Sequence, residues 1–97
     1  MNMQALMQQA QRMQKEITKK KDELNKKEFV GTSELVDVTF TGDKKLVSVK
    51  IKEDIESDDK EILEDMIAIA VNDAIDKINN ETNKIFGAYG SQLGGLF

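Results

Sequence analysis

Apolar residues in the first 27 positions of the chain recur every three or four residues, and this spacing constrains the fold more than any other feature. The set comprises Met3, Leu6, Ala10, Met13, Ile17 and Leu24. At about 100° per residue these positions fall in one narrow arc of a helix, and the surrounding Gln, Lys and Glu residues favour helix formation. We therefore predict a helix over residues 3–27, about 37 Å long. So narrow an arc is typical of a helix that packs lengthwise against another helix, and a small monomer can hardly cover it.

Two stretches with the two-residue alternation of β-strands follow. LVDVTF and LVSVKI alternate between apolar and polar residues, and the turn sequence TGDKK separates them. The pattern predicts an antiparallel hairpin with strands at residues 35–41 and 45–52. Residues 29–32, FVGT, are expected to add a short strand with Gly31 at a bend or bulge. Because an isolated hairpin is marginally stable, its apolar face is predicted to pack on a helix.

A second long helical pattern runs to about Phe86. Ser57 or Asp58 is predicted to cap its start, and Gly87 its end. The run Met66–Val71 is apolar without a break. The apolar arc spans about 200° in the first half of this helix and about 100° in the second half. So wide an arc indicates a helix covered on two sides, by the sheet of its own subunit and by a partner subunit.

Asp73 interrupts an apolar line on this second helix. It projects in the same direction as Ile62, Met66 and Ile69, where a further apolar residue is expected. We predict that Asp73 either marks the end of the covered surface or accepts hydrogen bonds at the subunit junction.

The composition removes most catalytic chemistry. The 97 residues include no Cys and no His, so disulfides, thiolate chemistry and the commonest general base and metal ligand are absent. The chain contains neither a phosphate-binding Gly-rich motif nor a nucleophile elbow. An acidic group at the start of the second helix lacks EF-hand spacing, and we interpret it as a solvated helix terminus. Its members are Glu56, Asp58, Asp59, Glu61, Glu64 and Asp65.

The length fits one small domain. We predict a single domain over residues 1–86 and a flexible Gly-rich tail over residues 87–97. No apolar run approaches the roughly 18 residues of a membrane span, and the start of the chain is not expected to be a signal peptide.

Charge is distributed unevenly along the chain. The net charge is −4, but residues 1–28 carry seven Lys or Arg and four Asp or Glu, whereas residues 56–83 carry two and nine. Four basic residues of the first helix project within about 60° of one another, nearly opposite the apolar arc. This basic ridge consists of Arg12, Lys15, Lys19 and Lys26. It is about 21 Å long, and it is either an ordinary solvated helix face or a surface for phosphates.

Three segments together resemble the YbaB/EbfC family of bacterial nucleoid-associated proteins. They are LMQQAQRMQKEI (residues 6–17), LVDVTFTGDKKLVSVKI (residues 35–51) and DDKEILEDMIAIAVNDAIDKI (residues 58–78). The resemblance covers nearly the whole chain. It implies an α+β fold of helix, small antiparallel sheet and long helix, joined into a tweezers-like homodimer. It also implies duplex DNA binding in the cytoplasm and no enzymatic activity.

In that family DNA binding is associated with the helices, including the basic first helix. The resemblance therefore implies the DNA-binding candidates Arg12, Lys15, Lys19, Lys20, Lys26 and Lys27. We predict a nucleoid-associated homodimer that contacts mainly backbone phosphates, with a role in nucleoid organisation and gene regulation. No cofactor, metal, membrane or small-molecule substrate is expected. The alternative is a dimeric adaptor that binds protein partners through its acidic surface or its C-terminal tail.

Overall fold

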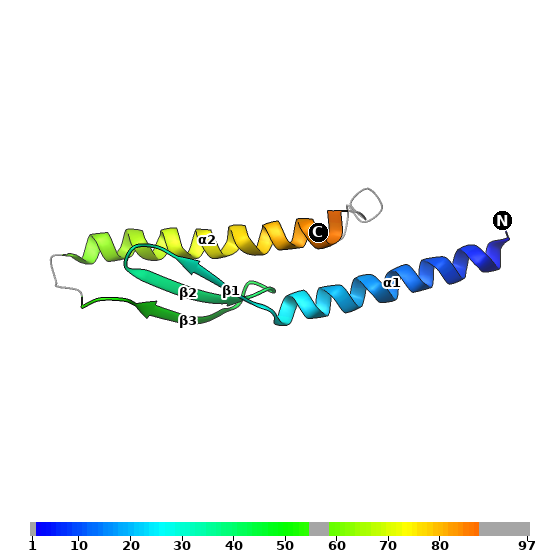
Figure 1. The fold of residues 1–97 in the computed structure, drawn as a ribbon, viewed down its shortest axis with the longest axis horizontal. Coiled ribbons are helices and arrows are strands. Elements are labelled where there is room, and N and C mark those ends of the chain that lie inside the picture. The colour runs from blue at the N-terminus through cyan, green and yellow to red at the C-terminus, as the bar shows by residue number, and fades with distance from the viewer. Residues whose placement is uncertain (1, 55–58, 88–97) are drawn as a thin grey trace.

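A computed structural model describes residues 2–54 and 59–87 and shows an α+β fold (Figure 1). The elements are α1 (Met3–Lys26), β1 (Glu28–Thr32), β2 (Val36–Thr41), β3 (Leu46–Ile51) and α2 (Lys60–Phe86). The strands form one antiparallel sheet in the order β1-β2-β3. The predicted fold class, both helices and all three strands are confirmed, with ends that shift by a few residues at most.

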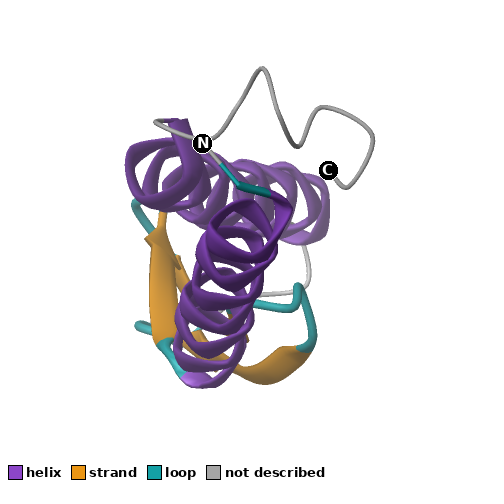
Figure 2. Ribbon diagram, turned by 90° about the vertical axis from the view of Figure 1, so that its right-hand side faces the viewer, coloured by secondary structure: helices purple, strands orange, loops and turns teal. Residues whose placement is uncertain are grey.

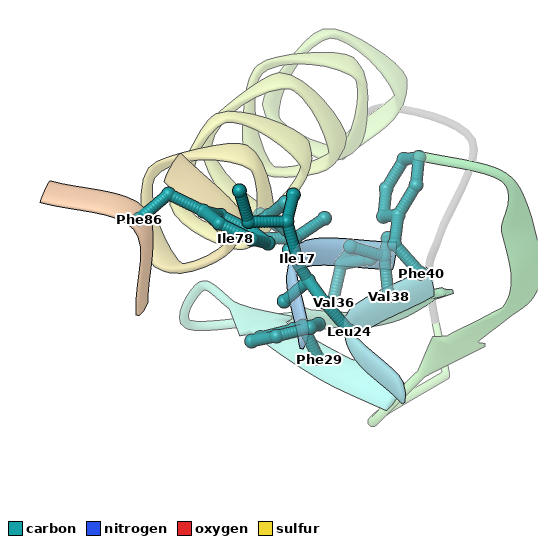
Figure 3. Packing of buried hydrophobic residues seen from close by; sticks show 10 residues of the cluster. Ile17, Leu24, Phe29, Val36, Val38, Phe40, Ile78 and Phe86 are labelled. Carbon is teal, nitrogen blue, oxygen red and sulfur yellow. The ribbon is translucent and has the colours of Figure 1, made fainter. Parts of the chain in front are cut away.

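The molecule is elongated, with extents of 70 × 20 × 15 Å. α2 lies along the sheet, whereas most of α1 projects beyond it (Figure 1). Viewed along the long axis, the two helices lie to one side of the sheet (Figure 2). The core between helices and sheet (Figure 3) is formed by Ile17, Leu24, Phe29, Val36, Val38, Phe40, Ala70, Ala74, Ile78 and Phe86.

Only the C-terminal half of α1 contributes to this core. Ile17 and Leu24 are buried, whereas every described residue before Met13 is exposed. Met3 is 76% exposed and Leu6 is 42% exposed. The lengthwise helix packing predicted for the apolar arc is therefore not made within the described part of one chain.

The inner face of the sheet follows from the alternation in β2. Val36, Val38 and Phe40 are buried, and the residues between them are half-buried. Because cross-strand neighbours share a face, the partners of these residues in β3 also point inward. This β3 inner row consists of Leu46, Val49 and Ile51.

The register of β2 and β3 shifts between Thr39 and Phe40. Thr39 pairs with Ser48 and Phe40 pairs with Leu46, so Val47 is an extra, bulged residue. Strict alternation places Val47 on the inner face with Val49 and Ile51. The bulge instead brings Leu46 to that face.

The predicted bend or bulge at Gly31 is wrong. β1 pairs with β2 in an unbroken register from Glu28 to Thr32. A Cβ atom on Gly31 would lie 2.0 Å from the carbonyl oxygen of Ala70 and 2.6 Å from the Cβ of Ala74. Gly is required here because α2 approaches the strand backbone closely, not because the strand bends.

The predicted turn between β2 and β3 is confirmed, and it packs against the end of α1. The N–H of Gly42 donates to the carbonyl oxygen of Lys27 at 2.9 Å. A Cβ on Gly42 would lie 1.8 Å from the carbonyl oxygen of Leu24. The left-handed position of the turn is Lys44, with φ of 65°. Gly42 thus permits the close approach to α1, and a lysine carries the unfavourable backbone conformation.

Replacing Lys44 with Gly is expected to raise the free energy of unfolding by about 0.5–1 kcal/mol, as measured by urea denaturation. A side chain in the left-handed backbone conformation costs free energy, and Gly removes this cost. The larger conformational entropy of the unfolded Gly variant offsets part of that gain. Lys45→Gly is the matched control, because Lys45 adjoins the turn without a positive φ. The control is expected to lose stability, and a loss at both positions contradicts the prediction.

Both helices have defined ends within the described residues. The side chain of Asn2 caps α1 by accepting a hydrogen bond from the backbone N–H of Ala5 at 2.7 Å. Asp59 occupies the N-cap of α2 and makes no side-chain capping bond. Gly87 occupies the predicted C-cap in a right-handed conformation, with its N–H bonded to the Asn83 carbonyl oxygen. The predicted caps at residues 57 and 58 and all but the first residue of the predicted tail lie outside the described residues.

Asp73 accepts hydrogen bonds within its own chain. Its Oδ2 lies 2.9 Å from the backbone nitrogen of Thr32 and 3.1 Å from Nζ of Lys77. The hydrogen bond from the Thr32 N–H, and then that from Lys77, lowers the pKa of Asp73 below its ordinary value. The predicted acceptor role is confirmed, but the donor is β1 of the same chain.

Candidate nucleic-acid interface

The basic ridge lies on the solvent side of α1. The helix turns Ile17 and Leu24 toward the core, and the ridge positions lie nearly opposite these two residues around the helix axis. All four ridge side chains are exposed. Because α1 projects beyond the sheet (Figure 1), a ligand as wide as duplex DNA can approach this face of the helix.

Polar groups accompany the ridge. A shallow hollow along α1 is lined by Gln11, Gln14, Lys15, Thr18, Lys19, Asp22, Glu23 and Lys26. The side-chain amides of Gln and the hydroxyl of Thr can donate hydrogen bonds to phosphate oxygens. The three lysine ammonium groups can do the same. The two carboxylates weaken the positive field of this face, which favours modest rather than tight binding of a polyanion.

Lys20 and Lys27 lie on a different side of α1 from the ridge. Both line a groove between α1 and α2, together with Glu81. The Nζ of Lys27 lies 3.4 Å from Oε1 of Glu81 and 5.6 Å from the centroid of the Phe29 ring. The structure therefore groups the four ridge residues on one face and places the other two candidates against α2.

Lys84 is a basic residue that the sequence analysis did not select. It is the basic residue in the last turn of α2, and it lines the same groove as Lys20 and Lys27. A cation at a helix C-terminus is favoured by the helix dipole, which was the signal available in the sequence. Only the packing of α2 against α1 brings Lys84 close to the basic helix.

The outward face of α2 has the opposite charge. Its exposed acidic side chains are Glu61, Glu64, Asp65 and Asp76. Across its whole length α2 carries six acidic and three basic residues. The negative charge of this face disfavours contact with a polyanion.

Other kinds of site are not seen in the described part of the chain. Within residues 2–54 and 59–87, no three acidic side chains are grouped as metal ligands, and no helix has the length and apolarity to cross a membrane. Two members of the predicted acidic group, Glu56 and Asp58, lie outside these ranges.

These features define a class of small α-β-β-β-α protein with a projecting basic helix and an acidic second helix. The chain belongs to the YbaB/EbfC DNA-binding family, whose model matches residues 1–93. This result confirms the resemblance seen in the sequence. The family is one of DNA-binding proteins and is not a known enzyme family.

Relatives match over nearly the full length. A nucleoid-associated protein of Enterococcus faecalis is 45% identical over 98 residues, which cover 98% of this chain and 94% of the relative. A nucleoid-associated protein of Streptococcus agalactiae serotype III is 46% identical over 96 residues, covering 96% and 97%. The crystal structure of the uncharacterized protein HP0035 from Helicobacter pylori matches with a TM-score of 0.73 at 25% identity. That match covers 93% of this chain and 99% of HP0035.

Proposed function

We propose that this protein is a nucleoid-associated DNA-binding protein that contacts duplex DNA through the basic ridge of α1. The observation that carries the proposal is the exposure of all four ridge side chains on a helix that projects from the body. Family membership supports DNA as the ligand, and the relatives' names support a location in the cytoplasmic nucleoid. A role in nucleoid organisation and gene regulation is part of the proposal.

The chemistry of the ridge favours contacts to phosphate rather than to bases. Lys and Arg side chains neutralise phosphates and release condensed counterions, which makes the affinity fall with salt. Specific base reading usually requires bidentate Arg, Asn or Gln contacts in the major groove. The ridge contains one Arg and three Lys, and the Lys ammonium groups act as point charges. We therefore expect binding with little sequence preference.

A salt titration of binding to a duplex DNA of mixed sequence tests the proposal. In about 50 mM salt, the triple variant Arg12→Glu, Lys15→Glu, Lys19→Glu is expected to bind at least about tenfold more weakly than the wild type. For each α1 helix that contacts the DNA, the slope of log affinity against log salt is expected to fall in magnitude by about 2.7, which is 0.9 for each of three lost phosphate contacts.

The matched control reverses three exposed lysines that do not belong to α1, at Lys45, Lys50 and Lys60. It changes the net charge by the same amount, so only long-range repulsion is expected to weaken binding, and the slope is expected to stay near that of the wild type. The proposal fails if the wild type shows no binding at about 50 mM salt, or if both variants lose affinity equally. A failure of DNA binding favours the alternative, a dimeric adaptor that binds protein partners.

We also infer that the functional unit is a homodimer. α2 packs against β1 and β2, and the β3 inner row stays between 46% and 52% exposed although its neighbours in β2 are buried. On α2, Ile62 and Ile69 are about half exposed as well. The β3 inner row pairs with the buried residues of β2 and so adjoins the core, and a second copy of the chain supplies a matching apolar face. In such a dimer two α1 helices project, in line with the tweezers-like form that the family resemblance implies.

A further inference from the structure

β1 is one of the two edges of the sheet, and side chains of α2 bond to two of its outward backbone groups. Nζ of Lys77 donates to the carbonyl oxygen of Val30 at 2.8 Å, and the N–H of Thr32 donates to Oδ2 of Asp73 at 2.9 Å. The carbonyl of one strand residue and the N–H of the residue two positions later point to the same side. They are the acceptor and the donor that a neighbouring strand uses.

The two side chains form one unit. Asp73 and Lys77 are one helical turn apart, and their charged atoms lie 3.1 Å apart. At Gly31, the residue between Val30 and Thr32, the backbone of α2 closely approaches β1. The missing side chain at Gly31 therefore lets two polar side chains of α2 reach the strand edge.

The other edge of the sheet differs. All six residues of β3 are exposed, and its inner row is apolar. A sheet with two open edges can add further copies head to tail, with β3 of one chain beside β1 of the next. Such contacts are heterologous and lead to open filaments unless the rotation closes a ring. A sheet with one open edge can form only a closed, symmetric pair by strand addition.

We propose that Asp73 and Lys77 close the β1 edge against strand addition by a second copy of this chain, and so prevent open-ended assembly. Two charged groups that are already bonded to the strand must be displaced before another strand can pair with β1. The carboxylate of Asp73 is ionised at neutral pH, as an ordinary Asp is, and the Thr32 N–H and Lys77 lower its pKa further. This role concerns the size of the assembly and does not depend on the DNA-binding proposal.

The double variant Asp73→Ala, Lys77→Ala tests the proposal by size-exclusion chromatography with light scattering across a range of protein concentrations. We expect species larger than the wild type whose share grows with concentration, together with thioflavin T binding. Adding Val30→Lys to the double variant is expected to suppress these species, because a lysine on an edge strand opposes strand pairing. Val30 is 48% exposed in the structure, so a lysine fits there without entering the core.

Two controls separate edge closure from a general loss of charge or stability. Asp76→Ala, Lys84→Ala removes the same charges from exposed positions of α2 and is expected to keep the wild-type mass. Asp73→Asn retains an oxygen that can accept from the Thr32 N–H, and it is also expected to keep the wild-type mass. The proposal is overturned if the double variant keeps a native circular dichroism spectrum and the wild-type mass at every concentration, or if Val30→Lys does not reduce the larger species.

A further variant covers the case in which the double variant does not fold. Lys77→Met keeps most of the aliphatic stem and loses only the ammonium group that bonds to Val30 and Asp73. With a native spectrum, it is expected to show a mass that increases with concentration above that of the wild type. A folded Lys77→Met variant with wild-type mass then overturns the proposal.

Discussion

Gly31→Ala is expected to lower the free energy of unfolding by about 3 kcal/mol or more. The new Cβ would lie 2.0 Å from the Ala70 carbonyl oxygen and 2.6 Å from both the backbone nitrogen and the Cβ of Ala74. These atoms belong to the backbone and to a side chain without rotamers, so only a movement of α2 away from β1 relieves the overlap. Urea denaturation followed by circular dichroism measures the loss.

Gly87→Ala is the control for Gly31→Ala. Among the described residues, nothing beyond the adjoining chain lies within 4 Å of the position of its Cβ. The φ and ψ of Gly87 are −57° and −35°, which alanine adopts readily. The control is expected to keep or slightly raise the stability of the wild type. If Gly31→Ala unfolds at the same urea concentration as Gly87→Ala, the close approach of α2 to β1 is wrong.

Val49→Asp is expected to convert the proposed homodimer into monomers. Val49 belongs to the β3 inner row, opposite the buried Val38, and it is 46% exposed in the single chain. A carboxylate at this position has to be desolvated when a second copy covers the row, and we expect the dissociation constant to rise by at least about 100-fold. Light scattering at micromolar concentration is expected to give twice the chain mass for the wild type and the chain mass for the variant.

Val30→Asp is the matched control for this second prediction. Val30 is 48% exposed, nearly the same as Val49, but it lies on the outer face of the sheet in β1. It is expected to leave the mass at that of the wild type. A wild-type protein that is folded and monomeric at micromolar concentration contradicts the dimer itself. A dimer that persists in Val49→Asp contradicts the choice of face.

The sequence by itself determined the elements and their order. The three-and-four spacing before residue 27 and the alternation in LVDVTF and LVSVKI are local properties, and the helices and strands form where these patterns occur. The basic ridge was also predictable, because the angle between two side chains of one helix depends only on their separation in sequence. The same angular relation gave the narrow apolar arc of α1 and the wide apolar arc of α2, and both arcs predicted a partner subunit.

Only the tertiary structure decided which residues meet across the chain. Asp73 bonds to Thr32, 41 positions away, and Lys27 meets Glu81, 54 positions away. The requirement for Gly at position 31 comes from the distance between α2 and β1, and the extra residue at Val47 comes from the pairing of two strands. Periodicity fixes the direction of a side chain relative to its own helix or strand. The contacts that make Gly31 and Asp73 important depend on the distance between separate elements, which packing sets and local spacing does not contain.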